Sequence, residues 1–131
     1  MITEKVKSFI QKHDYALVAS ADERGVPHLA AGRDLMVPDP EHIVFRAWFC
    51  NVTLHNLEKN AQVTLAVVDP VSGEGFQLAG RMEGVTATAF ADGLAPGEEP
   101  PGTPQVESSL TVLVQRVMAF TAGAHTDQPI E

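Results

Sequence analysis

The sequence predicts a mainly β protein that folds as a single domain. About six apolar segments alternate with the period of two that is typical of strands. Most of them are joined by short turns rich in Gly, Pro and Asp, which favour antiparallel pairing. The chain of 131 residues places only one short helix among these strands. This arrangement is typical of a closed barrel or a sandwich.

Residues 1–13 predict an amphipathic helix. Val6 and Ile10 lie about one helical turn apart, on a face that the neighbouring lysines avoid. Thr3 precedes this face and is a residue type that commonly caps helices. We therefore expect a short N-terminal helix that is capped by Thr3 and packs on the sheet.

Residues 15–88 are predicted to form five strands, with one helix over residues 51–60. The first strand starts at Tyr15, and a turn at residues 22–25 joins it to the second strand. The fifth strand, residues 75–88, is the longest of the five. The connections are short enough for sequential antiparallel pairing.

Strict alternation along two of these strands also assigns faces. In the second strand it puts Arg33 on the same face as Leu35. In the third strand it puts Arg46 on the same face as Trp48. A period of two throughout therefore predicts that each arginine shares a face with a large apolar side chain.

Three further segments complete the domain over residues 1–131. Residues 93–104 are rich in Gly and Pro and are expected to form an exposed acidic loop. Residues 108–120 are rich in Val and Leu and predict the last strand. Residues 122–131 predict a loose tail.

The composition argues against several classes of function. A net charge of −8, with nine basic against seventeen acidic residues, disfavours binding to nucleic acid or to an anionic membrane. We expect a cytoplasmic protein, because no apolar run approaches the roughly 20 residues that cross a bilayer and no signal peptide is recognised. The five histidines show no metal-ligand spacing. The single cysteine, Cys50, is interpreted as a small buried apolar residue.

A candidate anion site lies where the third strand meets the helix at residues 51–60. Arg46 stands near the end of that strand, and Asn51 or Thr53 is expected to cap the helix. The first N–H groups of a helix have no intrahelical partner and, together with the helix dipole, attract anions. An arginine beside them would complete a phosphate site. The alternative is that Arg46 faces water in a salt bridge while the helix simply caps itself.

Trp48 and Phe49 allow two interpretations. They are either core or interface aromatics, which is the commoner case, or the walls of a site for a planar ring. The sequence shows no nucleophile with an evident base, no P-loop and no dinucleotide fingerprint. No catalytic residue is assigned.

Several segments together resemble the pyridoxamine 5′-phosphate oxidase-like, FMN-binding split-barrel superfamily, in particular its short bacterial members. Residues 16–20 and 22–28 are similar to the family's first hairpin with its Gly-x-Pro signature. Residues 56–69 resemble its helix-to-strand segment, and residues 76–84, with their Gly-Arg pair, resemble its next strand. The resemblance covers over half of the chain.

The resemblance implies a six-stranded antiparallel split barrel that forms a homodimer, with FMN at the subunit interface. The residues that match the family's phosphate-binding positions are Arg46, Asn51 and Thr53. The strands would line the ribityl chain and the flavin ring, and the partner subunit would contribute Gln77. With Phe49 added as a candidate aromatic wall, the predicted cofactor-binding residues are Arg33, Asp34, Arg46, Ala47, Trp48, Phe49, Asn51, Thr53 and Gln77.

Three functions stay open. The first is a flavin-dependent oxidoreductase that acts on a small organic substrate. The second is a non-catalytic module that binds a flavin or another small ligand, and the third is a dimeric barrel without a cofactor. Val52 bears on the choice because many relatives carry Lys or Arg there, and losing that cation removes a contact of roughly 1.5–3 kcal/mol. Residues 93–104 also differ from the family, because many relatives carry a helix in that place.

Overall fold

The computed structural model describes residues 1–90 and 106–130 of the chain. The expected loop at residues 93–104 lies outside the described residues. In chain order the elements are α1 (Glu4–His13), β1 (Tyr15–Ala21), β2 (Pro27–Asp39), β3 (His42–Trp48), α2 (Asn51–Lys59), β4 (Gln62–Val68), β5 (Gly75–Phe90) and β6 (Val106–Phe120).

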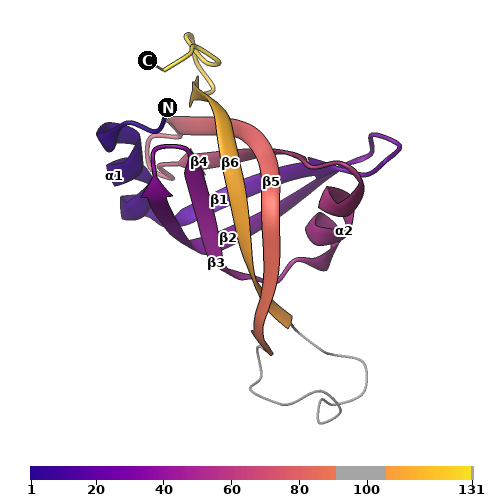
Figure 1. The fold of residues 1–131 in the computed structure, drawn as a ribbon. Helices are drawn as coiled ribbons and strands as arrows, with labels where there is room; N and C mark the ends of the chain where they lie inside the picture. Colours follow the sequence, from indigo (N-terminus) through magenta and orange to yellow (C-terminus); the bar gives the residue numbers. More distant parts are fainter. Residues whose placement is uncertain (91–105, 131) are drawn as a thin grey trace.

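The strands form a closed antiparallel barrel in the order β1-β2-β3-β6-β5-β4. The barrel closes because β1 pairs with both β2 and β4. Figure 1 shows α1 and α2 at opposite ends of the barrel, and β5 and β6 extending together beyond it. The predicted class, a mainly β barrel with peripheral helices, is confirmed.

The barrel interior is filled by side chains from every strand. Phe45 and Trp48 are its largest fully buried members, and their rings meet edge to face with centroids 5.1 Å apart. Val6 and Ile10 add the inner face of α1 to this core. The hydroxyl of Thr3 accepts a hydrogen bond from the Val6 amide at 3.3 Å, so the predicted cap is confirmed. Full burial of an aliphatic side chain contributes roughly 1.5–3 kcal/mol, which holds this short helix on the barrel.

Two irregularities change which side chains face the interior. Asp34 has a left-handed backbone with φ 62°, and Leu35 is buried while Arg33 stays outside. The register of β3 against β6 shifts near the end of β3, and Trp48 turns inward while Arg46 stays outside. The faces predicted by strict alternation are therefore wrong for both arginines, because each irregularity moves the following residues to the other face.

The C-terminal strap (residues 121–130) is tied to the end of β6. The amide of Ile130 donates to Val117 O at 2.9 Å, and the amide of Asp127 donates to Ala119 O at 2.9 Å. Asp127 adopts a left-handed backbone with φ 61°, which Asp tolerates better than most residues and which lets the strap fold back. The expectation of a loose tail is therefore wrong for these residues.

Candidate functional site

α2 begins without the side-chain cap that the sequence predicts. Its N-cap is Cys50, whose side chain makes no capping hydrogen bond. Asn51 and Thr53 are already inside the helix, and Thr53 is fully buried. The prediction of either residue as the cap is therefore wrong. The Cys50 side chain forms no capping hydrogen bond, but its thiol lies close enough to the Val52 and Thr53 amides for them to lower its pKa, so an anion at the positive end of the α2 dipole would share these amides with the thiol.

The thiol of Cys50 lies in a small polar cluster. Its Sγ is 3.4 Å from Nε2 of His28, on β2, and the Thr53 hydroxyl donates to it at 3.5 Å. Partial burial alone would raise the pKa of the Cys50 thiol. The Thr53 hydroxyl, the amides at the helix start and His28 outweigh this effect and lower that pKa.

The interpretation of Cys50 as a small buried apolar residue holds in part: the residue packs against the core, but it is only partly buried and its thiol has the polar neighbours His28 and Thr53. The sequence missed the cluster because His28 lies 22 residues before Cys50, and no motif spacing connects the two. The antiparallel pairing of β2 with β3 brings the start of β2 and the end of β3 together. A signal was present in the position of His28, which alternation places on the face of β2 opposite to Arg33.

Trp48 belongs to the core and has no surface to offer a ligand. Its side chain is 1% exposed, and its indole Nε1 donates to Cys50 O at 2.9 Å. Gly32 lies against the ring, since a Cβ atom there would come within 2.5 Å of Trp48 Cζ3. The core interpretation is confirmed for Trp48. Its predicted contact with a cofactor stays a prediction, which the burial of the ring in a single chain does not favour. Trp48 acts through the backbone, by fixing the residue from which α2 starts.

Arg46 faces solvent and pairs with an acid on the neighbouring strand. Its Nη2 lies 2.5 Å from Asp34 Oδ1, and the two side chains are 54% and 47% exposed. An exposed ion pair of this kind contributes about 0–1 kcal/mol. The salt-bridge alternative raised from the sequence therefore describes Arg46 in this structure. Its charge is partly neutralised by Asp34 before any ligand arrives.

Three of the predicted residues meet at a shallow hollow on the outer face of the barrel. Arg33, Ala47 and Phe49 line this hollow of about 380 Å³, together with Tyr15 and Ala31. Arg33 and Ala47 are paired across β2 and β3. Phe49 is 41% exposed and immediately precedes the N-cap of α2. The hollow and the open start of α2 are therefore neighbours along the chain.

Gln77 lies on another part of the outer face, on β5. It pairs with Ala66 of β4 and with Met118 of β6. Its side-chain Nε2 donates to Ala119 O at 3.4 Å and to the carboxylate of Asp127 in the C-terminal strap. Strands β4 and β1 separate it from β2 in the barrel order. One chain does not bring Gln77 to the hollow, and its contribution from a partner subunit stays a prediction.

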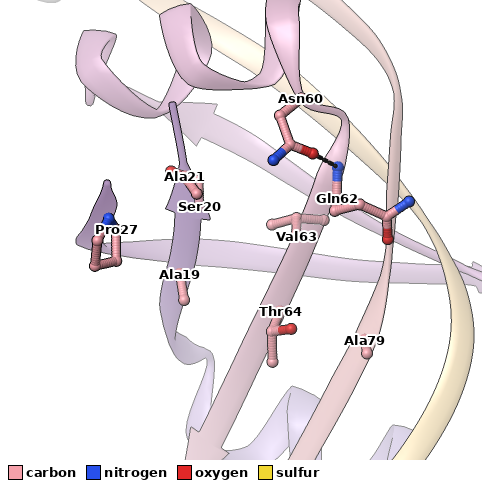
Figure 2. Close-up of a pocket in the computed structure, with 9 residues that line it drawn as sticks. All are labelled: Ala19, Ser20, Ala21, Pro27, Asn60, Gln62, Val63, Thr64 and Ala79. Atoms are coloured by element: carbon pink, nitrogen blue, oxygen red, sulfur yellow. Dashed lines mark hydrogen bonds between the residues drawn. The ribbon is translucent and has the colours of Figure 1, made fainter. Parts of the chain in front are cut away.

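A separate pocket of about 290 Å³ opens beside β1 and β4, next to the end of α2 (Figure 2). At its rim the amide of Gln62 donates to Asn60 Oδ1 at 3.2 Å. Its lining residues are Ala19, Ser20, Ala21, Pro27, Asn60, Gln62, Val63, Thr64 and Ala79. This set contains no residue of the predicted site, so the pocket is distinct from the hollow at Phe49.

The donors of the outer face suit an organic anion. They are the backbone N–H groups of α2 and an arginine, next to exposed aromatic rings. In the part of the chain that the structure describes, no group of three or more His, Cys, Asp or Glu residues is placed to hold a metal ion. None of the helices described is long and apolar enough to cross a membrane.

Comparisons with known proteins agree with this architecture. A family profile described as pyridoxamine 5′-phosphate oxidase matches residues 2–121. No curated protein sequence matches the chain. Among solved structures, a tagged HupZ from Group A Streptococcus has a TM-score of 0.70 at 25% identity, over 96% of this chain and 99% of that one. An FMN-binding protein from Syntrophomonas wolfei has a TM-score of 0.66 at 14% identity, over 88% and 84%. HutZ, the heme storage protein from Vibrio cholerae, has a TM-score of 0.58 at 15% identity, over 92% and 96%.

The last two likenesses concern the fold alone, because their sequence identities are low. The profile match shows family membership, since it spans residues 2–121 of a 131-residue chain. The closed six-stranded barrel agrees with it. The chain therefore belongs to the pyridoxamine 5′-phosphate oxidase-like family of split barrels.

Proposed function

We propose that this protein is a cytoplasmic homodimer that binds FMN at the subunit interface and uses it to oxidise or reduce small organic molecules. The observation that carries the proposal is the open start of α2, which Phe49 connects to the hollow lined by Arg33 and Ala47. An uncapped helix start suits a phosphate group. The adjoining shallow, partly aromatic surface suits a flat ring system.

The groups at the start of α2 fit a phosphomonoester. The amides of residues 51–53 lie in the first turn, where a helix offers no internal acceptor. Thr53 contributes only its amide, because its buried hydroxyl donates to the thiol of the N-cap. Arg33 supplies a positive charge from the hollow. Arg46 supplies a second only after leaving Asp34, an exchange that costs about 0–1 kcal/mol for an exposed pair.

The ring system would lie along the outer face beside two aromatic residues. Tyr15 and Phe49 are 43% and 41% exposed and both line the hollow. Aromatic side chains stack on planar rings with a gain beyond the buried area. FMN, when bound, supplies hydride and electron transfer, so the side chains of this protein need only orient the ring and exclude water.

Apolar side chains on the outer face support the homodimer. Leu29 is 65% exposed and Tyr15 is 43% exposed. A second hollow on this face, of about 310 Å³, has a mainly apolar lining of Tyr15, Leu17, Ala66, Val68 and Pro70, with Lys12 and His13 beside them. Contiguous exposed apolar surface favours association with a partner. A second copy that covers this face would also enclose the hollow at Phe49.

The test is a titration of the purified protein with FMN, followed by visible absorbance and by light scattering. We expect a bound flavin that a reductant bleaches and air restores, on a particle of twice the 14.1 kDa chain mass. If flavin binds but the protein oxidises no electron donor, the protein is a flavin-binding module and not an oxidoreductase. No binding at millimolar FMN refutes the proposal.

A parallel titration with hemin tests whether the protein binds heme instead of FMN. HutZ is a heme storage protein with the same fold, and bound heme gives an intense band near the edge of the visible range that flavin lacks. A tight heme complex, together with no binding of FMN, would assign the outer face to heme.

A further inference from the structure

The side-chain amide of Gln77 faces two hydrogen-bond acceptors. Its Nε2 lies 3.4 Å from the carbonyl oxygen of Ala119, and it also donates to a carboxylate oxygen of Asp127. A carbonyl group and an ionised carboxylate only accept hydrogen bonds. The nitrogen of the amide must therefore point toward them, because the flipped amide would set oxygen against oxygen.

The orientation of Nε2 in Gln77 also determines the direction of Oε1. Nε2 and Oε1 share one planar carboxamide group, so Oε1 is turned away from Asp127 and Ala119. Gln77 is half-buried, and no donor among the described residues forms a hydrogen bond with its Oε1. The side chain thus presents a single acceptor in a fixed direction.

This acceptor stands beside an apolar surface. Gln77 pairs directly with Ala66 across β5 and β4, and directly opposed residues project from the same face of a sheet. Ala66 lines the hollow of about 310 Å³, whose other lining residues are Lys12, His13, Tyr15, Leu17, Val68 and Pro70. A hollow that is apolar apart from Lys12 and His13, with one acceptor at its edge, suits a flat ring that carries an N–H group.

We propose that Asp127 is a positioning residue, which turns the Gln77 amide so that Oε1 accepts a hydrogen bond from a ring N–H of the bound cofactor. The inference rests on the proposed function, in which the ring is the flavin of the partner subunit and the donor is its imide N–H. Without Asp127 the half-buried Gln77 side chain is free to sample several rotamers, and ordering it on binding carries an entropic cost. The C-terminal strap is then part of the binding site although it does not touch the ligand.

The contact is tested first in the protein without cofactor. The side-chain NH₂ resonances of Gln77, identified with a Gln77→Ala variant, are expected to move in Asp127→Ala. They should stay near their original positions in Asp127→Asn, whose amide oxygen still accepts. Glu23→Ala is the matched control, since it removes one negative charge from the exposed turn between β1 and β2. Resonances that do not move in Asp127→Ala overturn the inference, whatever the protein binds.

The second measurement compares FMN with FMN methylated at the imide nitrogen. The wild type is expected to bind FMN roughly 2- to 10-fold more tightly, because the methyl group replaces the donated hydrogen. Asp127→Ala should bring this ratio close to 1, and Asp127→Asn should keep most of it. An Asp127→Ala protein that discriminates as well as the wild type overturns the positioning role.

The two failures are distinguishable. A wild type that binds neither flavin refutes the proposed function and with it the ligand named here. The resonance comparison still decides, on the protein alone, whether Asp127 orients Gln77.

Discussion

α1 begins at a threonine whose side chain closes the helix, whereas α2 begins at a cysteine that leaves it open. At α1 the hydroxyl of Thr3 accepts from the Val6 amide at 3.3 Å. At α2 the side chain of Cys50 makes no capping hydrogen bond. A helix start that its own chain leaves open is available to an external acceptor. One helix is therefore capped by its own side chain, and the other starts without a capping side-chain hydrogen bond.

The surroundings of the two helices differ in the same sense. α1 packs through Val6 and Ile10, which are fully buried. α2 exposes 49% of Val52 in its first turn and is preceded by Phe49, which is 41% exposed. Local rules of capping and burial are met at α1 and broken at α2. Departures of this kind are typical of functional sites.

The largest effect is expected at Arg33, in the hollow beside the start of α2. Arg33→Ala should weaken FMN binding roughly 10- to 100-fold, because a charge-assisted contact contributes roughly 1.5–3 kcal/mol. Riboflavin lacks the phosphate and should lose less. Arg46→Ala is the matched control and should cost several-fold less, since Asp34 already engages Arg46.

Calorimetric titration of each variant with FMN and with riboflavin checks this prediction. Equal losses of the two ligands would remove Arg33 from the phosphate. A larger loss of FMN binding in Arg46→Ala would return that role to Arg46.

A smaller effect is expected at Val52, in the first turn of α2. Val52→Lys adds the cation that many relatives carry and should tighten FMN binding about tenfold at low salt, with less gain at high salt. Val71→Lys is the control, because Val71 is 95% exposed in the turn between β4 and β5. Fluorescence titration at two salt concentrations measures both. An equal gain in the two variants would show a general charge effect instead of a local one.

The two helix starts should also respond oppositely to cap mutations. Thr3→Ala should lower the free energy of unfolding by about 1 kcal/mol, since it removes a real cap. Cys50→Asp should raise it by about 1 kcal/mol and should weaken FMN, because the new carboxylate occupies the open amides. Urea unfolding followed by circular dichroism measures the first change, and flavin titration the second. An unchanged FMN affinity in Cys50→Asp would show that FMN does not bind the amides at the start of α2.

The smallest change concerns the reactivity of Cys50. Its lowered pKa means that the thiolate persists below the ordinary thiol pKa of about 8.5 and is lost only as pH falls through the lowered value. The alkylation rate with iodoacetamide should therefore reach half its maximum at a lower pH in the native protein than in the urea-unfolded protein. His28→Ala should move the midpoint upward. Coincident midpoints in native and unfolded protein would show that the cluster does not act on the thiol.

Most of the fold could be predicted because it depends on local patterns. Alternation over residues 62–68 and the helical spacing of Val6 and Ile10 appear in the structure as β4 and α1. The cap at Thr3 needs only a hydroxyl next to a helix start. The predicted faces of Leu35 and Trp48 were wrong, because each residue follows a backbone irregularity that a strict period of two does not include.

The site could be predicted only in part, because it depends on which strands meet. Arg33 and Ala47 were assigned to the candidate site through the family resemblance and Phe49 through its place beside Trp48, and all three line one hollow. The contact of Cys50 with His28 arises because β2 pairs with β3, and a contact between residues 22 positions apart leaves no trace in local spacing. The strap that reaches Gln77 was missed for the same reason.

Gly32 has no side chain, yet it affects the position of the backbone at the start of α2. Its missing Cβ leaves room for the indole of Trp48, which holds the carbonyl of Cys50. A random-substitution survey scored by ligand capture would therefore rank Gly32 among the contact positions, although it offers no functional group. The same survey scored by thermal stability would rank it as a core position. A residue found by both screens is one whose packing in the core also fixes the backbone at the start of α2.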